Sequence, residues 1–207
     1  MEIGSATPLD SDRRSRRLTD SEGRVNRFFL APERFRDDTV TFPPDVSHQL
    51  SHVLRLRRGD QVIALDGSGM EADVELTGVA DESVGKIVRR RPNNAEPVAR
   101  VHVYVAILKA RKLEMVFQKC TEIGAASITP VRCERSVAEP PSVERSLRFE
   151  TIVREAAEQS GRGLLPTVGR TLELADAFER APARSLVLAT ESSGGRGREI
   201  EEVLSSN

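Results

Sequence analysis

Polar side chains that could bind and activate a ligand follow three apolar segments with the composition of buried strands. They are Lys109, Arg111 and Lys112 after the first segment, Glu134, Arg135 and Ser136 after the second, and Thr190, Glu191 and Ser192 after the third. Open parallel sheets bind ligands at the carboxyl ends of their strands, where such residues meet. Cations there can hold phosphate groups, and a carboxylate can accept a proton. We therefore predict a polar site at one edge of a sheet.

A further polar group stands at the end of a predicted helix. Residues 155–162 read Glu-Ala-Ala-Glu-Gln-Ser-Gly-Arg, which puts Glu155, Gln159 and Arg162 near one face at helical spacing. A helix end with this much polarity is unusual unless the groups satisfy one another or a ligand. We predict that these three residues line the same site or a dimer interface. A purely structural role is the alternative.

Other common kinds of site lack their sequence signatures. No Gly-x-Gly-x-x-Gly follows a strand and no Gly-Lys-Ser/Thr phosphate loop occurs, so ordinary dinucleotide and nucleoside-triphosphate sites are not expected. No Ser or Cys stands in a nucleophile-elbow context. His48, His52 and His102 lie far in sequence from the carboxylate cluster at the strand and helix ends, and the spacing of Cys120 and Cys133 fits neither zinc nor a disulfide framework. No metal site is therefore expected.

Charge and composition restrict the class of protein. The formal net charge is -1, so bulk charge does not argue for nucleic acid, yet arginines gather in the N-terminal part of the chain. A basic half is typical of a phosphate-binding face, although a solvated arginine-rich tail explains the same pattern. No apolar run can span a bilayer and no secretory signal is present, so we expect a cytoplasmic protein without a membrane partner.

The elements of the first half predict a small barrel. Residues 1–24 are polar and aperiodic, and we expect a disordered leader. A helix opens at Pro43-Pro44-Asp45, ends at Gly59-Asp60, and carries an apolar stripe of Val46, Leu50, Val53 and Leu54. Strands are expected at 61–65, 71–76 and 84–88. Short strands joined by tight turns indicate a β-barrel over residues 25–92.

Beyond a linker at 92–97 the chain alternates strands with helices. Val101–Leu108 is a nearly continuous apolar run, as a strand buried on both faces requires. A helix follows, with Leu113, Val116, Phe117 and Cys120 on one face and Gly124 at its end. The next elements are a strand at 127–131 and a helix from Ser142 to Gly161. A short helix with Leu172, Ala175 and Phe178 then precedes a strand at 185–189. This alternation predicts a parallel sheet with helices on both faces, so the fold class is α/β with an N-terminal β-barrel.

Five stretches resemble, in the same order, motifs of the 16S ribosomal-RNA uridine-N3 methyltransferases. They are Arg27-Phe28-Phe29, residues 52–60 (His-Val-Leu-Arg-Leu-Arg-Arg-Gly-Asp), residues 107–124 (Ile-Leu-Lys-Ala-Arg-Lys-Leu-Glu-Met-Val-Phe-Gln-Lys-Cys-Thr-Glu-Ile-Gly), Cys133-Glu134-Arg135-Ser136, and residues 155–162. Together they extend over roughly residues 26 to 191. Five motifs in the family order are far more specific than any one of them.

The resemblance implies a fold, a reaction and partners. The fold is a PUA-like RNA-binding barrel at 25–92 followed by a SPOUT domain at 98–207, a parallel sheet whose C-terminal part forms a trefoil knot. The reaction is transfer of a methyl group from S-adenosylmethionine to N3 of a uridine in 16S rRNA of the small ribosomal subunit, by a homodimer. The implied cofactor loop is Leu188, Ala189, Thr190 and Glu191.

The chemistry assigns roles to the remaining candidates. Uridine N3 must lose its proton before it attacks a methyl donor, and either Glu134 or Glu155 is a candidate acceptor. The target base must be single-stranded or flipped out of a helix. The predicted catalytic group is Glu134, Arg135, Glu155, Gln159 and Arg162. The predicted RNA contacts are Arg27, His52, Arg55, Lys109, Arg111 and Lys112.

Two family motifs that complete the cofactor site are missing from the sequence. Neither Gly-Pro-Glu-Gly-Gly nor the later Leu-Gly…Leu-Arg-x-Glu-Thr occurs in the 207 residues. We therefore expect a SPOUT domain truncated at its C-terminus, in a chain too short to be active alone. The alternative is a non-catalytic RNA-binding or dimerisation module. A different small-molecule enzyme on a similar sheet is a third hypothesis.

Overall fold

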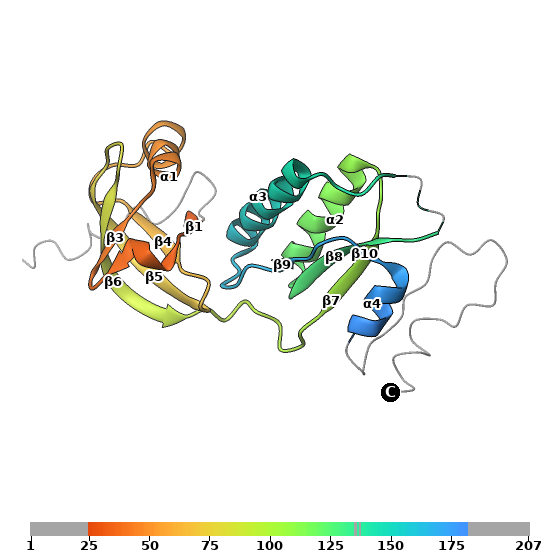
Figure 1. Ribbon diagram of the computed structural model, residues 1–207. Helices are drawn as coiled ribbons and strands as arrows, with labels where there is room; N and C mark the ends of the chain where they lie inside the picture. The colour runs from red at the N-terminus through yellow and green to blue at the C-terminus, as the bar shows by residue number, and fades with distance from the viewer. Residues whose placement is uncertain (1–24, 135, 137, 182–207) are drawn as a thin grey trace, which may run out of the picture.

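The computed structural model describes residues 25–134, 136 and 138–181 (Figure 1). Within these residues the chain forms two sheets, with α3 between the first sheet and the strands of the second. The expected leader at 1–24, the strand at 185–189 and the cofactor loop at 188–191 lie outside the described residues, as does Arg135. No helix in the described ranges combines the length and the apolar composition that crossing a bilayer requires.

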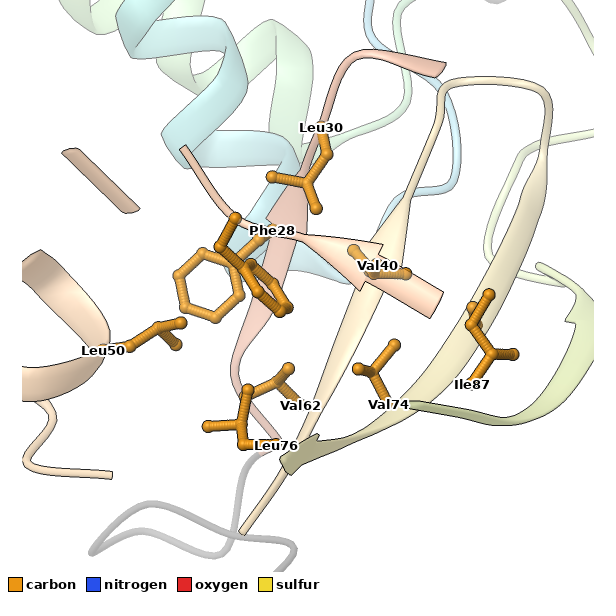
Figure 2. Packing of buried hydrophobic residues seen from close by; sticks show 11 residues of the cluster. Phe28, Leu30, Val40, Leu50, Val62, Val74, Leu76 and Ile87 are labelled. Carbon is orange, nitrogen blue, oxygen red and sulfur yellow. The ribbon is translucent and has the colours of Figure 1, made fainter. Parts of the chain in front are cut away.

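The first sheet has six strands and curls around an apolar core. Its strands, in spatial order, are β1 (Arg27–Phe29), β4 (Gln61–Leu65), β5 (Met70–Gly78), β6 (Val84–Pro92), β3 (Thr39–Thr41) and β2 (Phe35–Arg36), with a 3-10 turn, η1, at Pro32–Arg34. All neighbours are antiparallel except β1 and β4. The strands predicted at 61–65, 71–76 and 84–88 are thus confirmed. Figure 2 shows the core, where Phe28, Val40, Leu50, Val62 and Val74 meet.

The helical segment of this sheet differs from its prediction. Helix α1 covers Pro44–His48 and continues as a single π-helical turn, η2, over Gln49–Val53. It ends there because Arg55 adopts a positive φ of 54°, so the predicted end at Gly59-Asp60 is wrong. Leu50 is fully buried, but Val53 is 66% exposed. A π-turn changes the angular spacing of side chains, which takes Val53 off the predicted apolar stripe.

The second sheet is entirely parallel. Its strands are β7 (His102–Ala106), β8 (Ser127–Arg132), β9 (Thr167–Val168) and β10 (Leu172–Glu173), with β8 pairing to each of the other three. Helices α2 (Ala110–Glu122) and α3 (Val143–Ser160) pack on one face, and the rings of Phe117 and Phe149 stack between them at 4.2 Å. Both helices and the strand at 127–131 were predicted, and Ser142 caps α3 as expected.

Two burial predictions for this part are wrong. The strand β7 is not buried on both faces, because α2 and α3 cover the side of Val103 and Val105 while Tyr104 on the other side remains 38% exposed. Helix α4 (Leu174–Arg180) lies against β8 and β10 through Ala177, whereas Phe178 is 55% exposed. Of the predicted stripe, Leu172 lies in β10 and not in the helix, and the residue of α4 that is buried is Ala177 instead of Phe178.

Candidate functional site

The segments that leave β7 and β8 meet at one edge of the second sheet. The register pairs Ala106 with Val131, so both strands end at the same level. Lys109 precedes α2, and Arg111 and Lys112 lie in its first turn. Their side chains are exposed, and none of them forms an ion pair within residues 25–134, 136 and 138–181. We call Lys109, Arg111, Lys112 and Glu134 the strand-end site.

A small polar pocket lies at the same edge, beside Glu134. Its volume is about 210 Å³, and its lining residues are Arg132, Cys133, Glu134, Ser136, Ala138, Glu139, Pro140 and Glu173. The Arg132 Nε lies 3.4 Å from the Glu173 Oε1, and the Ser136 Oγ accepts a hydrogen bond from the Cys133 N–H at 3.0 Å. Carboxylates and a guanidinium group at one opening can bind a polar ligand and exchange a proton with it.

The described part of this pocket does not fit a nucleoside cofactor. Pockets that enclose drug-sized ligands have volumes of roughly 300–1,000 Å³ and are mostly apolar. The 210 Å³ pocket is smaller and polar in its lining. The predicted cofactor loop at 188–191 lies outside the described residues, so no cofactor contact is assigned to a described side chain.

Glu155 and Gln159 lie in a separate groove between α2 and α3. The groove has a volume of about 630 Å³ and is lined by Arg111, Glu114, Met115, Gln118, Glu122, Arg148, Ile152, Glu155, Ala156 and Gln159. An ion pair joins its two walls, with the Arg148 Nε 2.9 Å from the Glu114 Oε1. Glu155 and Gln159 therefore share one helix face, as their spacing predicts.

Arg162 does not belong to that face. Gly161 ends α3 in the left-handed conformation, with a φ of 79°, and the chain turns away from the helix axis. The buried Arg162 guanidinium donates to Glu96 and to the main-chain carbonyls of Thr121 and Ala125, at 2.7 Å for Ala125. These bonds tie the linker, the end of α2 and the end of α3 together. The contacts support a structural role for Arg162, which was the alternative to the predicted catalytic one.

Hydrogen bonds change the pKa of Glu96, the carboxylate that pairs with Arg162. Burial alone would raise the pKa of Glu96, but bonds from the Arg162 side chain and from the main-chain N–H groups of Leu164 and Gly163 lower it below its ordinary value. Both N–H groups lie 3.0 Å from the Glu96 Oε1. Glu96 is thus a charged anchor for the turn after α3, and the linker composition gave no sign of this role.

The structure does not bring all the predicted site residues together. Since α3 returns from the carboxyl ends of the strands, its last residues lie near the start of β8, where Thr167 of β9 pairs with Ser127. The six residues of β8 span about 16 Å. Arg162 is therefore at the opposite edge of the sheet from Glu134, and Glu155 and Gln159 lie along the helices between them. The described residues of the predicted site therefore do not form one neighbourhood, and the strand-end site stays a prediction from the register of β7 and β8.

The predicted RNA contacts of the first sheet also separate into two groups. His52 and Arg55 are exposed, and the His52 ring stacks on His48 with centroids 4.4 Å apart. Arg55 holds the positive φ that ends the π-helical turn. Arg27, in contrast, is the first residue of β1, and its Nη1 lies 2.7 Å from the Glu71 Oε2 in an ion pair. The open cationic surface therefore includes His52 and Arg55 but not Arg27.

Glu158 was not among the predicted site residues, although its environment is unusual. Its Oε1 accepts a hydrogen bond from the main-chain N–H of Phe29 at 2.9 Å. Burial raises the pKa of Glu158 to about 7, the nearby Glu155 acts in the same direction, and the Phe29 N–H and Arg154 oppose the shift. Helical spacing puts Glu158 near Glu155, three residues earlier, but it does not show that Glu158 is packed against the first sheet. Only knowledge of what α3 packs against could have identified it.

Comparisons with known proteins agree with the motif order. The RNA methyltransferase domain family matches residues 94–207. The ribosomal RNA small subunit methyltransferase E of Synechocystis sp. is 34% identical over 154 residues, which cover 74% of this chain and 50% of the relative. The Bacillus subtilis protein of the same name is 35% identical over 134 residues, 63% of this chain and 52% of the relative. This chain thus spans about half the length of the curated relatives it matches.

Solved structures show the same fold. A ribosomal RNA small subunit methyltransferase E from Neisseria gonorrhoeae, bound to S-adenosyl methionine, superposes with a TM-score of 0.68 at 26% identity, over 76% of this chain and 66% of that one. A predicted RNA methyltransferase from Thermotoga maritima has a TM-score of 0.58 at 30% identity, over 72% and 65% of the two chains. The predicted resemblance is confirmed, and the chain belongs to the RNA methyltransferase family.

Proposed function

We propose that this protein takes part in S-adenosylmethionine-dependent methylation of N3 of a uridine in 16S rRNA. The observation that carries the proposal is the strand-end site. Lys109, Arg111 and Lys112 begin α2 without an ion-pair partner in the described ranges, beside a pocket that contains Glu134. Three cations at the positive end of a helix dipole are electrostatically unfavourable without an anion, and RNA phosphates supply one. The names of the relatives support rRNA of the small subunit as the substrate.

The side chains at the sheet edge have separate tasks in this reaction. S-adenosylmethionine, when bound, supplies the methyl group. The cations hold the RNA backbone, which fixes the position of the target base. Glu134 accepts the N3 proton, directly or through water, and the guanidinium of Arg132 stabilises the negative charge that develops on the flanking carbonyls. Glu134 is preferred to Glu155 as the acceptor because Glu155 lies in the groove between α2 and α3.

The first sheet serves as the RNA-binding domain of the proposal, a PUA-like domain at 25–92. Its candidate surface is the exposed segment that follows α1, with His52, Arg55, Arg57 and Arg58. A π-helical turn and a positive φ at a non-glycine residue are local features that often accompany functional sites. A cytoplasmic homodimer belongs to the same proposal, and sedimentation equilibrium of the purified chain tests the dimer.

Methyl transfer to unmodified rRNA tests the function. A form of the protein extended to include the two cofactor-site motifs that the sequence lacks is incubated with small-subunit RNA that lacks base methylation and with methyl-labelled S-adenosylmethionine, and the product is digested to nucleosides. We expect labelled N3-methyluridine, with the rate reduced at least tenfold by Glu134→Gln and unchanged by Glu144→Gln, an exposed residue at the start of α3. Label in another base, or no label although the RNA binds, would contradict the proposal.

A non-catalytic RNA-binding module is the second candidate function. The exposed cations at this edge of the second sheet favour it, since Lys109, Arg111 and Lys112 can bind RNA phosphates without a cofactor. Titration calorimetry with S-adenosylmethionine separates the two candidates. Saturable binding supports the methyltransferase, whereas the absence of binding by a chain that retains RNA affinity supports the module.

A further inference from the structure

The second half of α3 joins the two sheets of the molecule. An apolar cluster links them, in which Phe29, Ile63 and Leu65 of the first sheet pack around Ala157 of α3, with Val25 at the margin. We call this contact the seam. Figure 1 shows the end of α3 beside β1. Ala157 and Leu65 are fully buried, so the seam is a packed contact rather than a loose approach of two units.

Polar groups of α3 complete the free edge of the first sheet. Among the strands of the described residues, β1 pairs only with β4, through bonds such as Ile63 N–H to Asn26 O and Leu30 N–H to Leu65 O. In a parallel pair, alternate residues direct their main-chain groups away from the neighbour, and Phe29 is one of them. The Phe29 N–H donates to the Glu158 Oε1 at 2.9 Å, and its carbonyl accepts from the Arg154 Nη1 at 3.5 Å. The two side chains thus take the place of a neighbouring strand.

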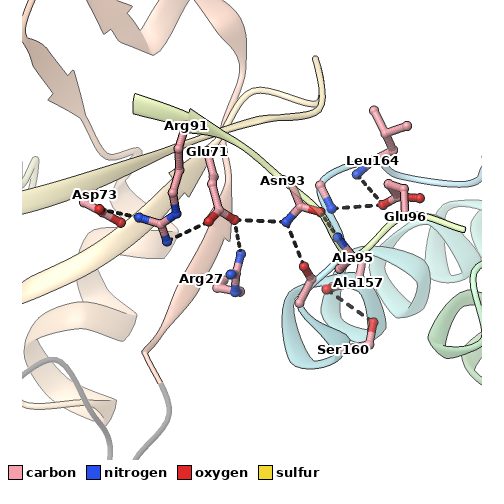
Figure 3. A network of polar contacts seen from close by, with 12 residues as sticks. Arg27, Glu71, Asp73, Arg91, Asn93, Ala95, Glu96, Ala157, Ser160 and Leu164 are labelled. Carbon is pink, nitrogen blue, oxygen red and sulfur yellow. Dashed lines mark hydrogen bonds and ion pairs between the residues drawn. The ribbon is translucent and has the colours of Figure 1, made fainter. Parts of the chain in front are cut away.

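A second group of polar contacts joins the end of α3 to the linker, next to the seam. The Asn93 Nδ2 donates to the Gly161 carbonyl and to the Glu71 Oε2, both at 2.9 Å (Figure 3). A Cβ at Gly163 would lie 2.5 Å from the Asn93 Cβ, so the turn after α3 lies directly against the linker. Asn93 does not titrate. The bond from Asn93 to the Gly161 carbonyl therefore does not depend on the charge of Glu158.

We propose that Arg154 and Glu158 form a clamp on Phe29 that positions the first sheet against α3, and that the clamp tightens when Glu158 takes up a proton. Docking removes water from the Glu158 carboxylate, and one main-chain N–H and one guanidinium replace that water only in part. A neutral Glu158 keeps a carbonyl oxygen for the Phe29 N–H and avoids most of this cost.

The direction of the pH effect follows from the two states of Glu158. In the docked state its pKa is about 7, above the ordinary value of 4.5 that a solvated carboxyl has. The docked state therefore binds the proton more tightly, so docking is firmest below pH 4.5 and weakens as the pH rises to about 7. The docking constant changes by at most tenfold per pH unit in this window. The charged groups that act on Glu158 are Arg154 and Glu155, both on α3. On β1, Arg27 is paired with Glu71, and the β4 residues in the seam are the apolar Ile63 and Leu65.

The amide resonance of Phe29 tests the clamp without RNA. Proton–nitrogen correlation spectra of the full chain are recorded from pH 5 to 8.5 for the wild type, for Glu158→Gln, which keeps the acceptor oxygen, and for Glu150→Gln, a matched exposed residue on α3. We expect the Phe29 amide to titrate with a midpoint near pH 7 in the wild type and in Glu150→Gln, and to stay constant in Glu158→Gln. A Phe29 amide that does not titrate in the wild type, or titrates equally in Glu158→Gln, overturns the clamp.

The consequence for RNA rests on the proposed function, because the clamp orients the sheet that carries His52 and Arg55. Affinity for a small-subunit rRNA fragment is measured at pH 4.5 and pH 8 as the ratio of the wild-type Kd to the Glu158→Gln Kd. We expect a ratio near one at pH 4.5, where Glu158 is protonated in the docked state and about half protonated in the undocked state, and a severalfold ratio at pH 8, where only the wild type carries the charge. A ratio that is the same at both pH values overturns the positioning role. Loss of RNA binding in every variant contradicts the proposed function instead, and leaves the Phe29 titration as an independent result.

Discussion

Arg162 illustrates how a polar residue in a recognisable motif can serve the fold rather than the chemistry. Arg162 is 4% exposed, and its guanidinium donates to Glu96 and to the main-chain carbonyls of Thr121 and Ala125 at the end of α2. Buried charges persist where such partners replace water. The sequence argument that polar groups at a helix end must satisfy one another or a ligand was sound. It could not say that the partner is Glu96 in the linker, 66 residues earlier in the chain.

Replacing Arg162 should therefore lower the stability of the fold, and should not remove a catalytic group. We expect Arg162→Met to lower the free energy of unfolding by about 3 kcal/mol, because Glu96 loses its counter-charge and two buried carbonyls lose their donor. Urea denaturation measures the loss, and Arg170→Met, at an exposed arginine, should change it by less than about 0.5 kcal/mol. A fully stable Arg162→Met protein would argue for the catalytic role instead.

Glu158 should leave a signature in the pH dependence of stability. Because its folded pKa lies above its unfolded value, the folded state binds more protons between pH 4.5 and about 7, and stability falls as the pH rises through this window. We expect Glu158→Gln to be more stable than the wild type by about 1–3 kcal/mol at pH 8. The difference should shrink toward zero at pH 4.5. Thermal or urea unfolding across this range measures it, and a difference that is independent of pH would contradict the assignment.

At the scale of elements, the direction of α3 decides which residues share a site. The sequence predicted this helix well, since Ser142 caps it and Gly161 ends it. It did not predict the seam, because helical spacing identifies faces but not what each face packs against. The two-residue strands β9 and β10 were also missed, since two residues carry no periodicity. The register of β9 with the start of β8 is what separates Arg162 from Glu134.

The cap of α3 is a test of this element alone. The Ser142 Oγ accepts from the Arg145 N–H at 3.3 Å. We expect Ser142→Ala to lower stability by about 1 kcal/mol, since a main-chain donor of the first turn loses its partner, and Ser142→Asp to restore it. Thermal melting of the two variants measures the effect. Equal melting temperatures for Ser142→Ala and the wild type would show that the cap contributes nothing.

The turn after α1 offers a test in which stability and binding change in opposite directions. Arg55 holds a φ of 54°, which glycine adopts without strain. We expect Arg55→Gly to raise stability by about 0.5–1 kcal/mol while it weakens RNA binding severalfold through the loss of a cation. Thermal melting and RNA affinity are measured on the same preparation. Arg57→Gly is the control, and it should lower affinity without raising stability.

At the scale of the whole molecule, α3 and the linker place a curled sheet with an exposed cationic segment next to a parallel sheet with a cationic edge. The sequence predicted two parts of this kind, because short strands with tight turns give way to strands that alternate with helices. It could not predict the polar network of Glu71, Arg91 and Asn93 that leads to the linker, since its members lie far apart in sequence. The strand-end site could be proposed from the sequence because strand ends are visible there as polar residues after apolar runs, and its role stays a prediction.

Cross-linking to RNA tests the central claim most directly, which is that the edge formed by Lys109, Arg111, Lys112 and Glu134 receives the substrate. The chain is irradiated with a 16S rRNA fragment that contains 4-thiouridine, and cross-linked peptides are identified by mass spectrometry. We predict cross-links in the peptide that contains Lys109–Lys112 and in the peptide around Glu134. Cross-links confined to α4 or to the groove between α2 and α3 would contradict the account.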